Sequence, residues 1–549
     1  MKSSPRRTAV AIAQLAALSA GALALTSTAV AATPVGALDP TFSPGGKAGV
    51  SDVIALRQLV DVAVQQDGKV VAISDQSLDF FIVRFNTDGS LDTTFGLTGT
   101  GVVSVDVAGA GVDDDATALI IDPQNRIVVA GKGGATPADF ALVRLSPDGK
   151  VVDLNVHTHL GNLADPAGAA DVALQSDGTI VTAGTTKVGA DTDFAVVRFD
   201  GATGAVAGTK FTDSFGTGNE SARGVAVYPS GPNKDKFVVV GDSGTAGNSA
   251  MIVNQRLANG SVDMSFNATG NRVIDPTVGS DSARGVAITA AGSIVVAGTN
   301  GAADQDLVVA QLLPSGAFDP AFNGGGVRTL VKPGSEFAQN HALALQPDGK
   351  ILLTADTSGV LDVGVFRLTP DGSADNTFGT NGDGTFDVNG NDDGNAIAYD
   401  PAGRVVVAGD EQASAGFVAR IIAAPDTDGD GVLDPADACP TVPGTLPNGC
   451  AVVPAPEAVL KGKKVLLSTV LAKKQASAKC PPKATVAVKT KSKKGTIKVT
   501  KLLRTKSVAT GCLVKGKIKL PAKPKKTAKV KVTVKGTKLT TKRLLAVRA

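Results

Sequence analysis

The sequence predicts an all-β protein in which seven copies of one unit close into a ring. Three observations support this prediction. Glycine contributes 64 of the 549 residues, which favours turn-rich β structure over helical bundles. Two apolar strands joined by a glycine-containing turn recur at a nearly constant spacing. The last copy lacks a motif that is found, without its partners, before the first copy.

The first 32 residues are typical of a secretory signal peptide. Lys2, Arg6 and Arg7 precede an apolar run, and Ala29-Val30-Ala31 provides small residues for cleavage. We therefore expect residues 1–32 to be removed and the protein to be secreted, extracellular and able to associate with the cell surface. No later stretch has the ~20 uncharged apolar residues that span a bilayer, so no membrane span is expected.

The second strand of each unit ends at Ala-Gly or an equivalent pair. These ends recur every 53 to 58 residues, at Ser74, Gly131, Gly184, Gly241, Gly298, Asp356 and Gly409. Each unit has room for about four short strands, which is the size of one propeller blade. Continuous apolar runs such as Ile127–Ala130 are typical of strands that are buried on both faces. The sequence therefore predicts a seven-bladed β-propeller over residues 33–423.

Two further motifs follow in each unit. A third strand carries an arginine that we expect to form hydrogen bonds within its own blade; it is found at Arg84, Arg144, Arg198, Arg256, Arg367 and Arg420, with Gln311 in the fifth copy. A turn and a Leu-Asp-x-x-Phe motif come next, as in Leu91–Phe95. The seventh copy stops at Ile422 without this motif, whereas Leu38–Phe42 precedes the first copy. We expect this N-terminal segment to complete the last blade, which leaves no open sheet edge.

The turn Pro147-Asp148-Gly149-Lys150 and the motif Leu91–Gly96 resemble those of the bacterial delta-60 repeat family. The resemblance extends over roughly residues 36–423 and recurs in the seven copies. It implies secreted, propeller-like modules. It implies no reaction and no catalytic residues.

An acidic loop follows the repeats, within residues 424–450. Its carboxylates fall at loop positions suited to a calcium ion, with a glycine, Gly431, at the sharp turn and the Val432 carbonyl as a further ligand. The carboxylates belong to Asp426, Asp428, Asp430, Asp434 and Asp437. Calcium takes six to eight oxygen ligands, and alternate acids in a tight loop converge to supply them. We expect bound Ca²⁺ here; the alternative is a solvated acidic linker.

The pattern from Asp426 to Pro440 is similar to a single thrombospondin type 3 repeat. That resemblance implies calcium binding by the five aspartates, a disulfide at Cys439 and an association with adhesion. The family has arrays of such repeats, and this chain has one.

A basic region follows the linker at residues 451–456. Lysine alternates with apolar residues, as in Lys529–Lys535, which predicts half-buried strands and a small Lys-rich β-sandwich over residues 457–549. The four cysteines suit an oxidising compartment. Local spacing favours the pairs Cys439–Cys450 and Cys480–Cys512, although three pairings are open.

Charge divides the chain in two. Residues 451–549 hold 28 lysines and arginines against one acid, Glu457, for a net charge of +27. Residues 33–450 hold 23 basic and 50 acidic residues, for a net charge of −27. We expect the basic domain to bind an anionic cell-wall or extracellular polymer, or the acidic propeller itself. This domain has no Phe, Tyr or Trp for base stacking, so specific nucleic-acid binding is not expected.

No catalytic motif is recognised in the sequence. It has no Gly-x-Ser-x-Gly elbow, no His-Glu-x-x-His helix and no phosphate loop. His157 and His159 share one strand face and are interpreted as an irregular edge rather than a metal site. We expect a non-catalytic recognition or adhesion protein whose propeller presents a surface for a protein or glycan ligand. The alternative is an extracellular hydrolase, lyase or dehydrogenase with a site at the central channel.

Overall fold

The computed structural model describes residues 33–434 with short gaps, and the backbone of seven strands between residues 457 and 548. The gaps before residue 434 are 43–48, 52–53, 56–57, 75–77, 110–111, 135–138, 161–166, 216–217, 246, 277–278, 302–305, 331–342, 358–361, 389–391, 401, 412–414, 426 and 428–431. Residues 1–32 and 435–456 also lie outside the described residues.

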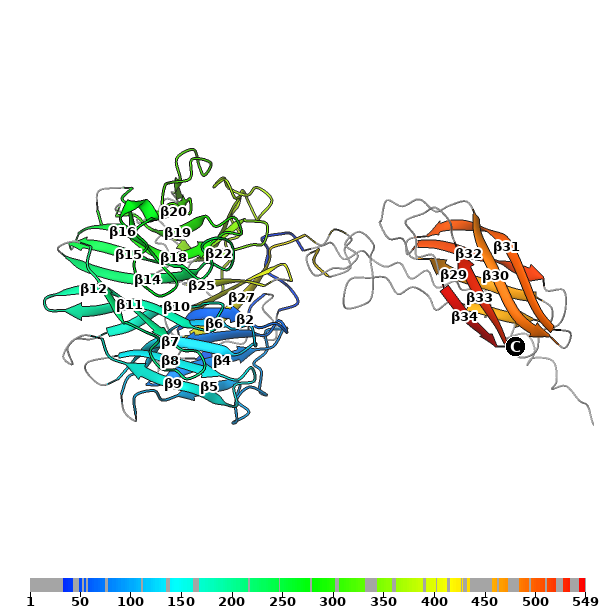
Figure 1. The fold of residues 1–549 in the computed structure, drawn as a ribbon, viewed down its shortest axis with the longest axis horizontal. Helices are drawn as coiled ribbons and strands as arrows, with labels where there is room; N and C mark the ends of the chain where they lie inside the picture. The colour runs from blue at the N-terminus through cyan, green and yellow to red at the C-terminus, as the bar shows by residue number, and fades with distance from the viewer. Residues whose placement is uncertain are drawn as a thin grey trace, which may run out of the picture.

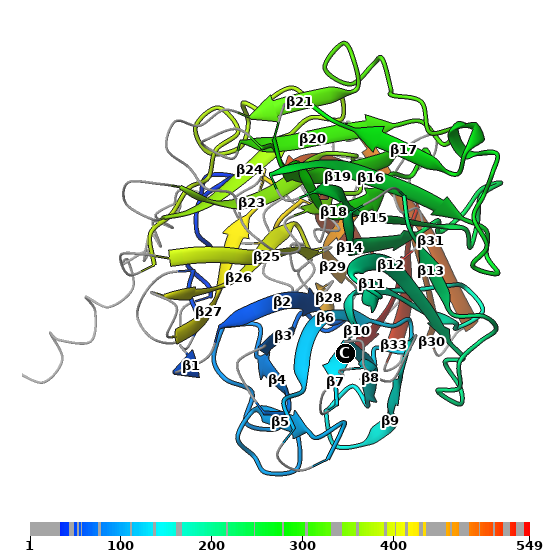
Figure 2. The same ribbon diagram turned by 90° about the vertical axis from the view of Figure 1, so that its left-hand side faces the viewer.

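Seven antiparallel blades surround a common centre, with β2, β6, β10, β14, β18 and β25 nearest to it (Figure 2). Blade one consists of β2 (Leu59–Val64), β3 (Val70–Ser74), β4 (Phe80–Phe85) and β5 (Val102–Val105). Blade two consists of β6 (Asp115–Ile121), β7 (Ile127–Gly133), β8 (Asp139–Leu145) and β9 (Val152–Thr158). Blade three consists of β10 (Ala167–Leu174), β11 (Ile180–Val188), β12 (Asp191–Phe199) and β13 (Phe211–Asp213).

The remaining blades follow the same order around the ring. Blade four consists of β14 (Asn219–Val227), β15 (Phe237–Thr245), β16 (Asn248–Arg256) and β17 (Asn271–Ile274), with the short 3-10 helix η1 (Phe266–Ala268) before its last strand. Blade five consists of β18 (Ser282–Ile288), β19 (Ile294–Thr299), β20 (Leu307–Leu312) and β21 (Val327–Leu330). Blade six consists of β22 (Leu343–Leu345), β23 (Ile351–Thr357) and β24 (Asp362–Leu368), and bridges at Asp383 and Phe386 form its outer edge. Blade seven consists of β25 (Asp392–Asp400), β26 (Arg404–Glu411), β27 (Ala415–Ile422) and β1 (Ile54–Ala55).

The apolar runs of the repeats are buried on both faces, as the sequence predicts. All five residues of β3 are buried. One apolar cluster combines Val71 and Phe80 of blade one with Leu119 and Ile127 of blade two. Each fully buried side chain of this kind contributes about 1.5–3 kcal/mol. A single blade has no partner for either face, so the ring is the unit that stabilises the strands.

The recurring Ala-Gly pair has a steric cause. The innermost strand of blade two has a β-bulge between Ala116 and Ala118, and Gly131 on the second strand lies opposite it. A Cβ atom at Gly131 would lie 1.9 Å from the carbonyl oxygen of Asp115. The same approach recurs at the equivalent glycines of blades three, four, five and seven, which are Gly184, Gly241, Gly298 and Gly409. The bulge therefore selects glycine at this position.

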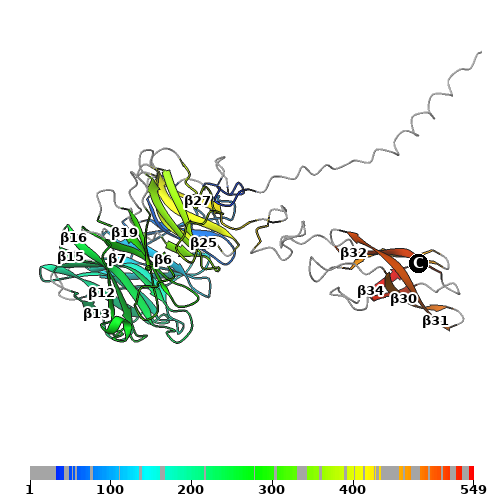
Figure 3. The same ribbon diagram turned by 90° about the horizontal axis from the view of Figure 1, so that it is seen from above.

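The N-terminal segment completes blade seven and closes the ring, as the missing motif predicts. Strand β1 pairs with β27, and further bridges join Leu38 to Ile421 and Val50 to Ala419. The amide of Asp39 donates to the carbonyl of Arg420 over 2.8 Å. Figure 3 shows this dark blue segment beside β27.

The basic region forms seven strands (Figure 1). They are β28 (Glu457–Lys461), β29 (Lys464–Leu471), β30 (Lys483–Ser492), β31 (Gly495–Val508), β32 (Gly511–Lys519), β33 (Thr527–Thr533) and β34 (Arg543–Arg548). Their hydrogen-bonded order is β28-β29-β32-β31-β30-β33-β34, and the long β31 pairs with β30 along its first part and with β32 along its last. A two-layer sandwich stays a prediction. In the described part of the chain, no helix is long and apolar enough to cross a membrane.

Candidate functional site

The repeated arginine lies at the centre of a cluster that we call the clasp: an arginine from the third strand, with the aspartate and phenylalanine of Leu-Asp-x-x-Phe. In blade one, Arg84 Nε donates to Asp92 over 2.8 Å, and its guanidinium carbon lies 4.6 Å from the ring centre of Phe95. In blade six, Arg367 makes the same contacts with Asp375 and Phe378, at 2.8 and 4.6 Å. These charges are buried, so each pair must satisfy its own hydrogen bonds.

The clasp arginines form the expected hydrogen bonds within their own blades, and most of them also join neighbouring blades, which the sequence did not predict. Arg84 donates to the carbonyl of Pro147 in blade two, and Arg198 donates to that of Asn259 in blade four over 3.1 Å. Arg144, Arg367 and Arg420 reach carbonyls of the next blade in the same way. The pattern differs in blades four and five, where Arg256 donates to Gly260 of its own blade and Gln311 donates to Asp319. A repeat pattern describes one unit at a time and therefore hides such contacts.

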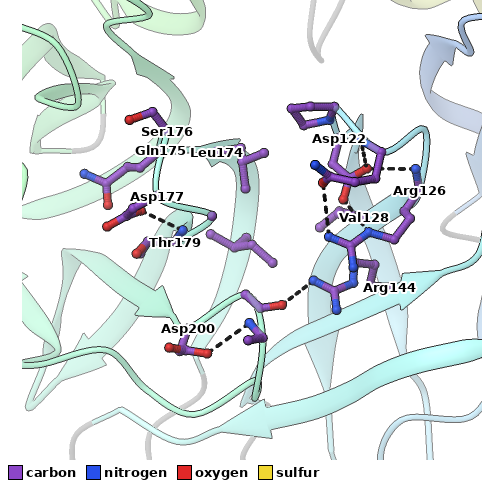
Figure 4. A pocket seen from close by; sticks show the side chains of 16 residues that line it. Asp122, Arg126, Val128, Arg144, Leu174, Gln175, Ser176, Asp177, Thr179 and Asp200 are labelled. Carbon is purple, nitrogen blue, oxygen red and sulfur yellow. Dashed lines mark hydrogen bonds and ion pairs between the residues drawn. The ribbon is translucent and has the colours of Figure 1, made fainter.

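A pocket of about 610 Å³ lies between blades two and three, where their turns meet (Figure 4). Asp122, Arg126 and Arg144 line it from blade two. The turn between β10 and β11 and the turn at Asp200–Ala202 line it from blade three. Figure 4 shows the two arginines on one wall, across from Asp177 on the other.

This pocket has a cause in the sequence of the first turn. Gln65, Asp122 and Gln175 occupy the same place in blades one, two and three, because the amide of each donates to the carbonyl at the end of its turn. The two glutamines also bridge to the next blade. Gln65 Nε2 donates to the carbonyls of Asn125 and Pro147 over 3.1 and 3.0 Å. Gln175 Nε2 donates to those of Asp235 and Ala258 over 2.6 and 2.9 Å.

Asp122 does not make this bridge. Its shorter side chain turns back and accepts from the amides of Gln124 and Arg126 over 2.9 and 2.8 Å. Its second oxygen accepts from Arg126 Nε over 2.6 Å. The space that a glutamine bridge fills at the neighbouring blade interfaces is therefore open between blades two and three.

The predicted calcium loop is described in part. Of the proposed ligands, Val432 and Asp434 are described, whereas Asp426, Asp428, Asp430 and Asp437 lie outside the described residues. The carboxylate of Asp434 accepts from the amide and hydroxyl of Thr427 over 2.9 and 2.6 Å. The amide of Asp434 donates to the carbonyl of Pro425 over 2.8 Å. Asp434 therefore lies beside Thr427, and calcium binding by the loop stays a prediction.

The residue before Asp434 attaches the loop to the propeller. Leu433 is 6% exposed. A Cβ atom at Gly403, in the first turn of blade seven, would lie 3.3 Å from that of Leu433. Leu433 is therefore buried close to this turn of the ring.

The predicted disulfides involve Cys439, Cys450 and Cys480, which lie outside the described residues. Cys512 lies on β32, of which the backbone alone is described. The disulfide pairs stay predictions.

The two neighbouring histidines meet a single carboxylate at the outer edge of blade two. His159 Nδ1 lies 2.5 Å from Asp139 Oδ1, and His157 Nε2 lies 4.0 Å from Asp139 Oδ2. Among the described residues, no group of three or more His, Cys, Asp or Glu side chains could hold a metal ion.

Polar side chains at the central bulges hold adjacent blades together. Thr117 Oγ1 donates to the carbonyl of Ala169 in blade three over 2.9 Å. Asn395 Nδ2 donates to the carbonyl of Leu59 in blade one over 3.0 Å. These contacts give the bulge residues a structural role, and a catalytic site at the channel stays the alternative to the expected recognition role.

The comparison with protein families points to the same unit. The family described as "Domain of unknown function (DUF5122) beta-propeller" matches residues 65–95, 123–151, 175–202, 292–322 and 346–378. Five segments of the chain are therefore similar to the units of a propeller repeat family. The matched propeller repeats belong to blades one, two, three, five and six. No curated protein matches the sequence.

Solved structures with a similar fold include enzymes. Virginiamycin B lyase from Staphylococcus aureus, in a catalytically inactive form with quinupristin, is 12% identical, with coverage of 66% of this chain and 96% of that chain and a TM-score of 0.40. An ulvan lyase is 10% identical, covering 68% and 96%, with a TM-score of 0.42. Penicillium chrysogenum α-L-arabinanase with arabinobiose is 14% identical, covering 62% and 98%, with a TM-score of 0.39. Similarity at this level carries no conclusion about this chain.

The inter-blade pocket was not predicted from the sequence. Its signal is the change from glutamine at positions 65 and 175, in the two neighbouring blades, to aspartate at position 122. Asp122 and Arg126 look like ordinary turn residues unless the three copies are compared at that position.

Proposed function

We propose that this chain is a secreted, non-catalytic recognition or adhesion protein that binds calcium. In this proposal the propeller is the interaction surface, the loop at residues 424–450 binds Ca²⁺, and the basic domain attaches to an anionic cell-wall or extracellular polymer. The observation that carries the proposal is the arrangement of the described part of the loop, where Asp434 accepts from Thr427 and the neighbouring Leu433 is buried. A loop fastened at this end can stiffen the junction when an ion draws its carboxylates together.

The described part of the loop fits a calcium ion. A carboxylate offers about four lone-pair sites, so Asp434 can accept two bonds from Thr427 and still bind a cation. With the ion bound, Asp426, Asp428, Asp430, Asp434, Asp437 and the carbonyl of Val432 would hold it. Without the ion, five carboxylates within twelve residues repel one another.

Calcium binding can be tested on the mature chain by thermal unfolding. A single extracellular loop is expected to have a Kd of about 10⁻⁴–10⁻³ M. Calcium at about ten times the Kd should stabilise the chain by about 1.4 kcal/mol, and chelator should reverse the effect. The Asp428→Asn/Asp430→Asn variant is the control and should not respond. An equal response in the variant, or none in the native chain, would reject the calcium site.

Attachment by the basic domain needs a separate test. Deletion of residues 457–549 should release the protein from isolated cell walls at low salt, because the net charge of +27 is lost with the domain. The intact chain should be released by added salt. If the truncated protein stays on the walls, the basic domain is not the anchor.

A further inference from the structure

The pocket between blades two and three has no surplus positive charge. Arg126 pairs with Asp122 at 2.6 Å, and Arg144 Nε donates to Asp153 over 2.8 Å. The guanidiniums near the pocket are Arg126, Arg144 and Arg198, and the carboxylates are Asp122, Asp153, Asp177 and Asp200. Three positive charges thus face four negative ones. An anionic ligand would meet net repulsion here, so the pocket disfavours phosphate, sulfate and carboxylate groups.

The pocket nevertheless offers hydrogen bonds to a ligand. The terminal nitrogens of Arg126 reach Asp153 and Gln124 only at 3.4 Å, which is beyond the usual range for N–H donors. A ligand oxygen at a normal distance would improve on both contacts. On the opposite wall, Asp177 Oδ1 accepts from the amide of Thr179 over 2.9 Å, and the residue is exposed.

A hydroxyl group satisfies both walls. It accepts from a guanidinium and donates to a carboxylate, whereas a carbonyl can only accept and an ammonium can only donate. Val128 and Ile180 also line the pocket, but both side chains are buried in the apolar core between the blades, so polar contacts must carry the binding. The volume of about 610 Å³ lies within the range of small-molecule sites.

We propose that this pocket binds a neutral, hydroxyl-rich sugar residue of a glycan. This inference rests on the proposed role of the propeller as an interaction surface, and it names the position and the ligand class. Arg126 donates to ring hydroxyls, Asp177 accepts from them, and the Asp122 turn keeps the space open.

The test uses the mature full-length chain and a set of simple sugars. The neutral probes are the methyl glycosides of glucose, galactose and mannose, together with N-acetylglucosamine; glucuronic acid is the anionic counterpart. Binding is measured by calorimetry and by saturation-transfer NMR. We expect at least one neutral sugar to bind with a millimolar Kd, and glucuronic acid to bind at least about tenfold more weakly.

Two variants place the binding in this pocket. Asp122→Gln restores the residue that bridges the neighbouring blades and should weaken binding by about tenfold or more. Asp400→Gln is the matched control, because Asp400 also caps the first turn of its blade, accepting from the amide of Ala402 over 2.8 Å. It should leave sugar binding unchanged. Asp177→Asn should also weaken sugar binding. Because Asp177 is exposed, this substitution should leave the fold intact, so a loss of binding cannot be attributed to misfolding.

Three results would overturn the proposal: no binding of any neutral sugar, tighter binding of glucuronic acid that Asp122→Gln weakens, or binding of the neutral sugar that survives both Asp122→Gln and Asp177→Asn. Failure here differs from failure of the proposed function. If the chain responds to calcium and stays on cell walls but binds no sugar, only the sugar proposal is rejected. A chain that binds sugar but ignores calcium and walls keeps the pocket and loses the calcium and anchor roles.

Discussion

Arg420 Nε donates to the carboxylate of Asp39 over 2.9 Å, although the two residues are 381 positions apart in the chain. The guanidinium carbon of Arg420 also lies 4.5 Å from the ring centre of Phe42. These are the contacts that Arg84 makes with Asp92 and Phe95, eight and eleven residues further along the same blade. The N-terminal segment Leu38–Phe42 therefore supplies the aspartate and phenylalanine of the clasp in blade seven, as Leu91–Phe95 does in blade one.

The clasp arginines should contribute strongly to stability, in a graded way. Arg84→Ala removes one of the two cations that pair with the buried Asp92, because Lys69 Nζ stays 2.7 Å from the carboxylate, and should cost about 1.5–3 kcal/mol of unfolding free energy. Arg84→Gln should cost less, because Gln311 occupies this place in blade five and bonds to Asp319 over 2.8 Å. Urea unfolding of the two variants checks the order. Equal costs would show that the charge pair adds nothing beyond a hydrogen bond.

Stability should fall in acid as the clasp carboxylates take up protons. Burial opposes the ionisation of Asp375, but hydrogen bonds from Thr377 and the charge of Arg367 outweigh it and lower the pKa to about 2. A carboxyl whose folded pKa lies below its ordinary 3.8 stabilises the fold above that value and loses the effect as pH falls toward 2. Asp375 should therefore contribute about 2 kcal/mol near neutrality that is lost between about pH 4 and pH 2.

Thermal unfolding between pH 5 and pH 2 measures this loss, and Asp375→Asn is its control. The variant should be less stable at neutral pH and show a shallower fall in acid, because its contribution is already absent. Parallel curves for the variant and the native chain would contradict the assignment.

Glycine opposite the bulge should be indispensable. Gly131→Ala places a methyl carbon 1.9 Å from the carbonyl oxygen of Asp115, so the innermost strand must move. We expect a loss of about 2–4 kcal/mol, in the range of steric changes in a packed core. Gly325→Ala is the control, since no atom lies within 4 Å of its added Cβ. Similar unfolding midpoints for the two variants would refute the steric explanation.

Leu433 should couple the calcium loop to the ring. Leu433→Ala removes a buried side chain and should lower stability by about 2 kcal/mol. It should also shrink the difference in melting temperature between calcium and chelator, because the loop end is then no longer held against Gly403. Leu97→Ala is the control at an 82% exposed residue. A calcium effect of undiminished size in Leu433→Ala would separate the loop from the ring.

The blades and their closure could be predicted because each depends on local patterns. Strand period and turn residues define the unit, and the absence of Leu-Asp-x-x-Phe after Ile422 indicates where Leu38–Phe42 must lie. The second partner of Arg84 could not be predicted in this way, since Pro147 belongs to another repeat. The pocket could not be predicted for the same reason. It exists because Asp122 lacks the hydrogen bonds to the next blade that Gln65 and Gln175 make, and those bonds join different repeats.

The most direct test of the account compares the chain from residue 33 with one that begins at residue 43. The central claim is that Leu38–Phe42 closes the ring through Asp39 and Phe42. The shorter chain should unfold at a clearly lower denaturant concentration, and the full-length Asp39→Ala/Phe42→Ala variant should reproduce most of the loss. Closure in this form would be contradicted if the shorter chain unfolded at the same denaturant concentration as the longer one.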